Sequence, residues 1–539
     1  MVHPASRPRS RPRTTPTSRT TPTSRTTRTP HTARTPRSPR GRLALAIGIA
    51  LAAGALAIPA VNAAPTNAPA APATASAAAP SGKLPRDDFN GDGYADLAVA
   101  APEASVDGRT RAGYVAVVYG SASGLDTGSR QVVSQNTPGV TDSAETDDQF
   151  GSAVSGADLD RDGYADLIVG VTGEDSVEGG AETGLVQVVW GGADGLSGGA
   201  ALVYGHNTYD RLSARAQLTV GDVDGDGASD LVVVEGLTDL RVVKGPFGRD
   251  GSASGGEQIV HDDSDPRFLD LATGDVNGDG IDDVVGTMND GDEYDARRVT
   301  YWQGTRDGLA AGVVLRDGRD WRVQGGESLD LGDVNGDGYE DIVVGRPVDG
   351  YDSDLDTPIP LGGRVAFIPG SANGPVGTRA MYVNQDSAGV PGAAERSDGF
   401  GSDVSVADVD GDGYADVSTG VPGEDFDGLS SAGGAIVLRG GANGLTGAGA
   451  TGVNQDTTGV PGAAETDDAF GRTTHLVDGN GDGRAELVVG APGENANAGS
   501  VWVFRSTSAG VTPTGSFTFG AGTLGTVAAN ARLGSGFNY

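Results

Sequence analysis

The chain of 539 residues contains no cysteine, only 5 histidines and 3 methionines, and few aromatic residues. Without cysteine the protein has neither a disulfide nor a thiol nucleophile. After residue 63 only His206, His261 and His475 remain, and none has a partner at the spacing of a metal site or a catalytic triad. No pair of carboxylates stands out for glycoside chemistry, because acids occur throughout. The sequence therefore singles out no catalytic residue and no residue for an organic cofactor.

Basic residues are also scarce beyond the amino-terminal region. The first 42 residues hold 11 arginines and no acid, whereas the residues after 63 hold 27 basic side chains against 73 acidic ones, a formal charge of −46. Surfaces of this sign repel phosphate groups, so nucleic acid and anionic membranes are excluded as expected partners of the mature chain.

The amino-terminal region has the three parts of a secretory signal peptide. A basic stretch precedes an apolar run from Leu43 to Val61, which ends in the small-residue pattern Val61-Asn62-Ala63. We expect residues 1–63 to be a signal peptide with a long basic n-region, and residues 64–83 to be a disordered spacer rich in Ala and Pro. An uncleaved membrane anchor is the alternative, since the apolar run is long enough to span a bilayer. Release predicts a secreted, extracellular protein, with the cell surface as a second location.

Seven copies of a nine-residue acidic string are the dominant feature of the rest of the chain. They read DFNGDGYAD, DLDRDGYAD, DVDGDGASD, DVNGDGIDD, DVNGDGYED, DVDGDGYAD and DGNGDGRAE. Side-chain oxygens at positions 1, 3, 5 and 9, a Gly at position 6 that permits a sharp turn, and the carbonyl of position 7 form the ligand set that Ca²⁺ requires. The sequence therefore predicts up to seven calcium loops.

The predicted ligands are the following residues. Position 1 is Asp88, Asp158, Asp222, Asp275, Asp333, Asp408 and Asp478. Position 3 is Asn90, Asp160, Asp224, Asn277, Asn335, Asp410 and Asn480. Position 5 is Asp92, Asp162, Asp226, Asp279, Asp337, Asp412 and Asp482. Position 7, through its carbonyl, is Tyr94, Tyr164, Ala228, Ile281, Tyr339, Tyr414 and Arg484, and position 9 is Asp96, Asp166, Asp230, Asp283, Asp341, Asp416 and Glu486.

The spacing of the strings predicts the architecture. Their mean period is 65 residues, so seven units account for residues 84–539 and leave no room for a separate catalytic domain. Short β-branched runs such as DLIVG at 166–170 and GYVAVVYG at 113–120 follow each string, bounded by Gly, Asp, Asn and Pro. A unit of this size with several short strands is typical of one propeller blade. The prediction is an all-β, seven-bladed β-propeller with calcium-binding hairpin loops.

Further motifs identify a family resemblance. Phe150-Gly151, Phe400-Gly401 and Phe470-Gly471 each stand eight residues before a string, and segments such as Gly490-Ala491-Pro492 follow. The pattern resembles the FG-GAP repeat of the integrin α-chain amino-terminal propeller and its secreted bacterial relatives. The resemblance implies four-stranded blades whose metal loop joins the innermost strand to the next. The Phe-Gly position of the third to fifth units instead holds Ala214-Arg215, Arg267-Phe268 and Gly325-Gly326, so we expect those blades to pack differently.

The two ends of the chain predict how the circle closes. Pro80, eight residues before the first string, lies in the Ala/Pro-rich stretch, so the first unit lacks an inner strand of its own. The segment 533–537, Leu-Gly-Ser-Gly-Phe, matches the Phe150 to Val154 pattern instead. We expect the carboxyl terminus to supply the missing strand and to remove an open edge.

Three functions fit these features. The leading hypothesis is a secreted, calcium-binding, monomeric adhesion or ligand-binding module for an extracellular protein or glycan. The resemblance places the ligand on the face opposite the metal loops, where segments 135–151, 384–401 and 454–471 are expected to cross. A polysaccharide-active lyase or hydrolase is the alternative, and would need basic residues and an acid at one mouth of the ring. A structural wall or matrix protein is the third hypothesis.

Overall fold

The computed structural model describes residues 86–538 except 177–179, 208–210, 214–216, 237, 263–265, 291–292 and 353–356. The predicted signal peptide and spacer lie outside the described residues. Contacts separate residues 1–76 from residues 77–539, and every described residue belongs to the second of these units. Within the described residues, no helix is both long enough and apolar enough to cross a membrane.

Seven four-stranded antiparallel sheets form the blades, as predicted. From the inside outward, blade 1 is β30 (Gly536–Phe537), β1 (Leu97–Ala101), β2 (Tyr114–Val118) and β3 (Arg130–Val133). Blade 2 is β4 (Phe150–Ala157), β5 (Asp166–Val171), β6 (Leu185–Trp190) and β7 (Ser197–Tyr204); blade 3 is β8 (Leu218–Gly221), β9 (Asp230–Glu235), β10 (Asp239–Lys244) and β11 (Gly256–Val260). Blade 4 is β12 (Pro266–Gly274), β13 (Asp283–Asp290), β14 (Glu293–Trp302) and β15 (Val313–Val314).

The remaining blades follow the same order. Blade 5 is β16 (Ser328–Gly332), β17 (Asp341–Arg346), β20 (Arg364–Ile368) and β21 (Met381–Val383), with an added pair, β18 (Gly350–Asp352) and β19 (Thr357–Ile359). Blade 6 is β22 (Val404–Ala407), β23 (Asp416–Val421), β24 (Gly434–Arg439) and β25 (Thr446–Val453); blade 7 is β26 (Thr473–Val477), β27 (Glu486–Ala491), β28 (Ser500–Thr507) and β29 (Gly510–Gly520). Short helical turns are η1 (Gly377–Arg379), α1 (Glu494–Asn497) and α2 (Ala521–Leu524).

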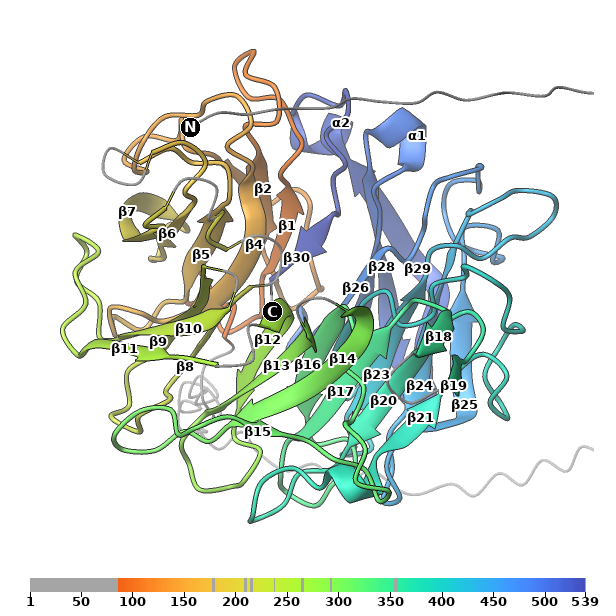
Figure 1. Ribbon diagram of the computed structural model, residues 1–539. Coiled ribbons are helices and arrows are strands. Elements are labelled where there is room, and N and C mark those ends of the chain that lie inside the picture. The colour runs from red at the N-terminus through yellow and green to blue at the C-terminus, as the bar shows by residue number, and fades with distance from the viewer. Residues whose placement is uncertain are drawn as a thin grey trace, which may run out of the picture. The chain divides into compact units, whose positions relative to one another are not determined.

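The blades stand around one axis and close into a ring (Figure 1). Each innermost strand contacts the innermost strand of the next blade, in the order β4, β8, β12, β16, β22, β26 and β30, and β30 contacts β4 again. The carboxyl terminus therefore completes blade 1, as the sequence predicted. Its strand is short, and pairs Phe537 with Val99 and Gly536 with Ala100.

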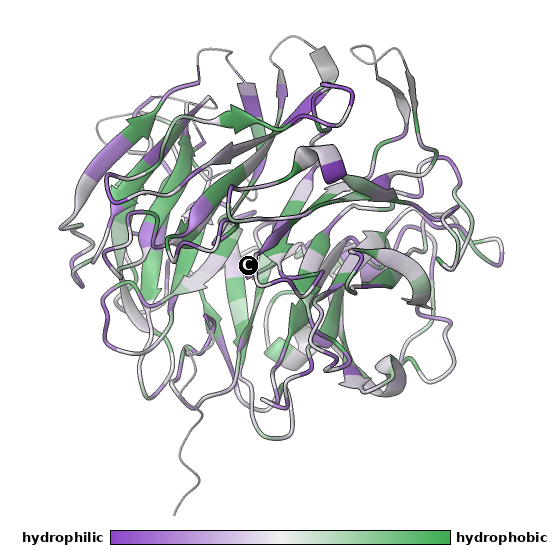
Figure 2. Ribbon diagram, turned by 90° about the horizontal axis from the view of Figure 1, so that it is seen from below, coloured by the Kyte–Doolittle hydropathy of each residue, from purple (hydrophilic) through white to green (hydrophobic). Residues whose placement is uncertain are grey.

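The hydrophobic core lies between adjacent blades. All six residues of β5 and of β6 are buried, whereas the outermost strand β11 is largely exposed. Because the middle strands of a blade are covered on both faces, they read as continuous apolar runs rather than alternating ones. Figure 2 shows the hydrophobic residues gathered on the strands and hydrophilic ones on the connections.

Close backbone approach explains the glycines of the family motif. A Cβ on Gly420, in the second strand of blade 6, would lie 1.7 Å from the carbonyl oxygen of Gly471 in blade 7. Phe470, which precedes Gly471, is fully buried and pairs in a parallel bridge with Gly433. At the ring closure Leu533 takes this place, and bridges Gly499. Leu533 is therefore the counterpart of the motif phenylalanine, as the sequence pattern predicted.

Blades 3 to 5, where the Phe-Gly pair is missing, still form complete four-stranded sheets. In blade 4 the buried Phe268 stacks on Trp302 with ring centroids 5.9 Å apart, a Phe–Trp contact that blade 7 makes with Phe470 and Trp502 at 5.3 Å. The tryptophans of the third strands, Trp190, Trp302 and Trp502, are 1–3% exposed, whereas Trp321 is 39% exposed. Trp321 is thus the one tryptophan that lies outside the core.

Candidate metal centre

The seven acidic strings lie at the same edge of their sheets. Each joins the innermost strand of a blade to the second strand, as loop 158–166 joins β4 to β5; in blade 1 the second strand β1 follows the string and β30 is the innermost strand. Antiparallel order places the connections between blades, which enter each innermost strand at its other end, at the opposite edge. We number the loops 1 to 7 with their blades.

The position 9 carboxylate anchors each loop to its own sheet. Asp166 accepts hydrogen bonds from the backbone N–H of Leu159, at position 2, and of Gly191, the glycine after the third strand, at 2.9 and 2.8 Å. The glycine after the third strand donates in the same way to position 9 in loops 1 to 6, at 2.8–3.0 Å. Glu486 of loop 7 departs from this pattern, since its backbone partner in the described structure is Gly479, at position 2 of the same loop, at 3.1 Å.

Burial of these carboxyls changes their acidity. Each is at most 4% exposed. Burial is the largest cause that raises the pKa, to about 8 for Asp96, to about 7 for Asp166, Asp230, Asp283, Asp341 and Glu486, and to about 6 for Asp416. A cation beside such a buried carboxyl offsets the desolvation free energy of its ionised form.

Positions 1, 3 and 5 shape the loop through its own backbone. In loop 1 Asp88 accepts hydrogen bonds from the N–H of Asp92 at 3.0 Å and of Gly93 at 2.8 Å, and Asp92 accepts one from the N–H of Tyr94 at 3.1 Å. The bonds from positions 5 and 6 to the position 1 carboxylate recur in loops 2 to 5 and 7, and the bond from position 6 recurs in loop 6. The loop backbone thus fixes the position 1 carboxylate in all seven loops.

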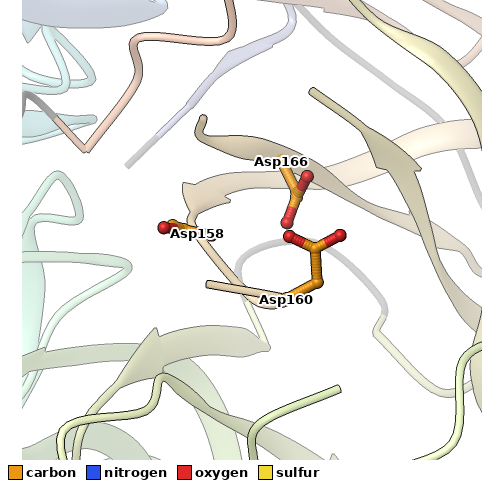
Figure 3. Close-up of side chains that lie close together, drawn as sticks. All are labelled: Asp158, Asp160 and Asp166. Carbon is orange, nitrogen blue, oxygen red and sulfur yellow. The ribbon is translucent and has the colours of Figure 1, made fainter. Parts of the chain in front are cut away.

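Three loops, all with Asp at position 3, each gather three carboxylates. These groups, with ligand oxygens within 4.8 Å of one another, are Asp158, Asp160 and Asp166; Asp222, Asp224 and Asp230; and Asp408, Asp410 and Asp416. Figure 3 shows the carboxyl oxygens of Asp160 and Asp166 facing each other, with Asp158 beside them. In loops 4 and 5 an Asn at position 3 instead donates to position 9, from Asn277 to Asp283 at 3.2 Å and from Asn335 to Asp341 at 2.8 Å.

A basic side chain reaches the extra carboxylate in each of these three loops. Lys244 lies 3.1 Å from Asp224, and Arg439 lies 2.9 Å from both Asp410 and Asp416. Each of these two cations is the last residue of the third strand in its blade. Arg249, from blade 3, lies 2.6 Å from Asp160 of blade 2 and also pairs with Asp162. These partners were not predicted from the sequence.

Neighbouring loops also contact each other around the ring. The position 7 side chain of one loop covers position 4 of the preceding loop: a Cβ on Gly91 would lie 2.5 Å from Tyr164, and one on Gly336 would lie 2.6 Å from Tyr414. Loop 2 reverses this pairing, because it has Arg161 at position 4, and loop 3 has the small Ala228 at position 7. There Arg161 donates to the carbonyl oxygen of Asp226 at 3.1 Å. The loops therefore form one connected belt.

The donor set of the belt fits a hard cation. Every predicted side-chain ligand offers oxygen, the position 9 carboxyls are buried, and positions 3 and 9 meet in loops 2, 3 and 6. Positions 1, 3, 5 and 9 would hold the ion, and the position 7 carbonyl stays a prediction.

Comparison with known proteins matches the family on five blades. The FG-GAP repeat family matches residues 86–118, 150–189, 325–356, 400–438 and 470–504, which lie in blades 1, 2, 5, 6 and 7. Blade 5 is matched although it has Gly325-Gly326 where the motif has Phe-Gly.

Curated relatives match over parts of the chain. Phosphatidylinositol-glycan-specific phospholipase D of Mus musculus is 35% identical over 150 residues, 27% of this chain and 17% of the relative. Integrin alpha-PS2 of Drosophila melanogaster is 35% identical over 167 residues, 29% and 11%, and integrin alpha-IIb of Homo sapiens is 43% identical over 94 residues, 17% and 8%. The chain thus spans less than a fifth of the length of these relatives.

Among solved structures, rhamnogalacturonan lyase YesW aligns over 75% of this chain and 82% of that one at 16% identity, with a TM-score of 0.32, too low to show a shared fold. The matched repeats, the four-stranded blades and the closed ring agree with one another. The chain is an FG-GAP repeat protein with an integrin-like, seven-bladed β-propeller.

Proposed function

We propose that the protein is a secreted, calcium-stabilised binding module whose propeller presents a ligand surface outside the cell. The observation that carries the calcium part is the buried position 9 carboxyl, which recurs in all seven loops and accepts a hydrogen bond from the glycine after the third strand in six of them. An ion that binds only the folded protein stabilises it by roughly 2.7 kcal/mol per site when its concentration is a hundredfold above Kd. Extracellular calcium would suit sites of modest affinity.

The ligand surface proposed here is the edge of the sheets opposite the loops. The connection from β15 to β16 carries Trp321, which is 39% exposed and has the guanidinium of Arg319 stacked 4.1 Å from its ring centroid. Tyr382 on β21 is 41% exposed, with Arg364 stacked at 4.5 Å. Exposed aromatic rings beside guanidinium groups suit a glycan or a protein loop. We propose an extracellular protein or glycan as the partner and a monomer as the working form.

Binding of the purified chain to a glycan and protein array, in calcium and in chelator, tests this proposal. We expect calcium-dependent binding to at least one ligand, weakened at least tenfold by Trp321→Ala. Lys83→Ala, in the predicted spacer, is the control and should bind like the parent. Binding unaffected by both chelator and Trp321→Ala would contradict the proposal.

Calcium analysis after dialysis tests the metal component separately. We expect six well-occupied loops, with loop 7 different because Glu486 lacks the glycine partner of the other position 9 residues. Fewer than four bound ions per chain would contradict uniform loops.

The alternative proposal is a polysaccharide-active lyase or hydrolase, and it needs an accessible cation beside an acid. The arginines of β14 and β17 come nearest to this arrangement. Arg297 pairs with Glu327, and Arg298 lies 2.7 Å from Asp262, but Arg297, Arg298 and Arg346 are only 1–4% exposed. Their burial favours a structural role and therefore the binding module. A glycan depolymerisation screen separates the two, since any product formed by the purified chain would favour the enzyme.

A further inference from the structure

Three junctions between blades bury a second set of carboxyl groups, at the edge of the sheets opposite the calcium loops. Each junction joins a Gln that follows the outermost strand of one blade to an Asp and a Glu of the next. We call these sets the acidic corners: Gln135, Asp148 and Glu174; Gln385, Asp398 and Glu424; and Gln455, Asp468 and Glu494. Five of the six carboxylic residues are 2–9% exposed, and Glu424 is half-buried.

The glutamine of each corner points to a missing partner. Its Nε2 donates to the Glu carboxylate, at 2.6 Å from Gln135 to Glu174, at 2.8 Å from Gln385 to Glu424 and at 2.6 Å from Gln455 to Glu494. The Oε1 of all three glutamines is buried and has no hydrogen-bond partner in the described structure. These glutamines are only 1–4% exposed. A buried amide oxygen without a partner is costly, and its recurrence in all three corners calls for a common explanation.

Close backbone contact holds the two acids of a corner together. The residue before each Glu is a glycine, and its N–H donates to the carbonyl of the corner Asp at 2.8–3.1 Å, as from Gly423 to Asp398. A Cβ on Gly423 would lie 2.0 Å from the carbonyl oxygen of Ser397. The glycine is therefore required for the approach. No ion pair among the described residues includes any of the six corner acids.

The junction between blades 7 and 1 shows the same corner without its acids. The corner Asp stands two residues before the motif phenylalanine, and Ala531 holds this place before Leu533. Ala104, two residues after Pro102, holds the place of the Glu, and Glu103 holds the place of the glycine. Both alanines are fully buried in an apolar cluster with Leu524. In these four junctions the two acids are present together or absent together, which supports the view that they act as a pair.

We propose that each acidic corner binds a cation, with calcium as the ion that its oxygen donors suit. The Asp and Glu carboxylates would supply the charge, and the glutamine Oε1 the neutral ligand. The ion would tie the end of one blade to the start of the next, on the face opposite the loops. These sites are additional to the seven loops, and the proposal goes beyond the proposed function.

A count of bound calcium in the purified full chain tests this proposal. The triple variant Glu174→Gln, Glu424→Gln and Glu494→Gln keeps side-chain volume and one acceptor oxygen at each position, removes the three negative charges, and leaves all seven loops unchanged. We expect it to bind three fewer calcium ions per chain than the parent. Glu103→Gln, at the corner without the acid pair, should bind as many as the parent.

An unchanged count in the triple variant would overturn the proposal, and would show that a shared proton rather than an ion neutralises each corner. The single variants provide the same test if the triple variant does not fold, since each should lose one ion. A corner whose single variant keeps the full count is not a cation site. The variant Asp162→Asn, in loop 2, serves as a reference for the number of calcium ions lost when one loop is impaired.

Discussion

The loops with Asp at position 3 differ from loops 4 and 5, which have Asn there, in the group that contacts their acids. In loops 2, 3 and 6 the extra carboxylate is matched by Arg249, Lys244 or Arg439. In loops 4 and 5 the Asn amide donates to the position 9 carboxylate, and no basic side chain pairs with position 1, 3 or 9 among the described ion pairs of these loops. The comparison teaches that a fourth acid is accompanied by its own counter-ion.

The largest expected effect comes from pH, because all seven loops act together. A carboxyl whose pKa is higher in the folded than in the unfolded protein takes up a proton on folding, so its contribution to stability is lost as pH rises through the folded pKa. Metal-free protein should therefore lose stability as pH rises from about 4, where carboxyls of the unfolded chain ionise, through about 6 to 8, the range of the folded position 9 pKa values. Protein in saturating calcium should keep its stability over this range, so the difference in melting temperature between calcium-saturated and metal-free protein should widen as pH rises. A constant gap would contradict the account.

Loss of a position 9 ligand should give the next largest effect. In calcium, Asp341→Ala of loop 5 removes a ligand and leaves the N–H groups of Val334 and Gly370 without their acceptor. We expect a loss of about 3 kcal/mol in the free energy of unfolding. In chelator, Asp416→Ala of loop 6 should lower the free energy of unfolding less than Asp341→Ala does, because Arg439 keeps its pair with Asp410. Denaturant unfolding measures both, and equal losses in chelator would remove the distinction between the two loop types.

Removal of a counter-ion should have opposite effects on stability and affinity. Arg439→Gln leaves Asp410 and Asp416 without their cation, so metal-free protein should lose about 2 kcal/mol. Calcium should bind loop 6 several-fold more tightly, because the competing cation is gone. Arg505→Gln, at an exposed position of β28, is the matched control and should change neither quantity. Weaker calcium binding by Arg439→Gln would show that the arginine supports the ion rather than replaces it.

The smallest expected effect comes from an exchange at position 3. Asn335→Asp gives loop 5 a fourth acid without a counter-ion, and should lower the melting temperature in chelator by a few degrees while it raises calcium affinity. Asp410→Asn in loop 6 should lower calcium affinity, because the loop loses one negative charge while Arg439 remains in place. Isothermal titration of both variants compares them directly. A change of the same sign in both would contradict the distinction between the two loop types.

Much of the fold could be predicted because its signals are local and repeated. The nine-residue strings placed the loops, and Leu533-Gly534 predicted the closing strand that pairs with β1. The counter-ions could not be predicted, because they come from distant parts of the chain; Arg249 belongs to a different blade from Asp160. For Lys244 and Arg439 a signal was present, since each directly precedes the glycine that follows the third strand. The acidic corners likewise combine residues of two blades: segments 135–151, 384–401 and 454–471 contain their Gln and Asp, but the Glu lies farther along the chain, after the second strand of the next blade.

The central claim is that calcium is part of the folded structure, and thermal unfolding in excess calcium and in EDTA tests it most directly. Several sites that each add roughly 2.7 kcal/mol at a hundredfold excess over Kd should sum to a large rise in melting temperature. The account predicts that the chain in calcium melts well above the chain in EDTA, and that calcium added back restores the higher value. Identical melting in the two conditions would contradict it.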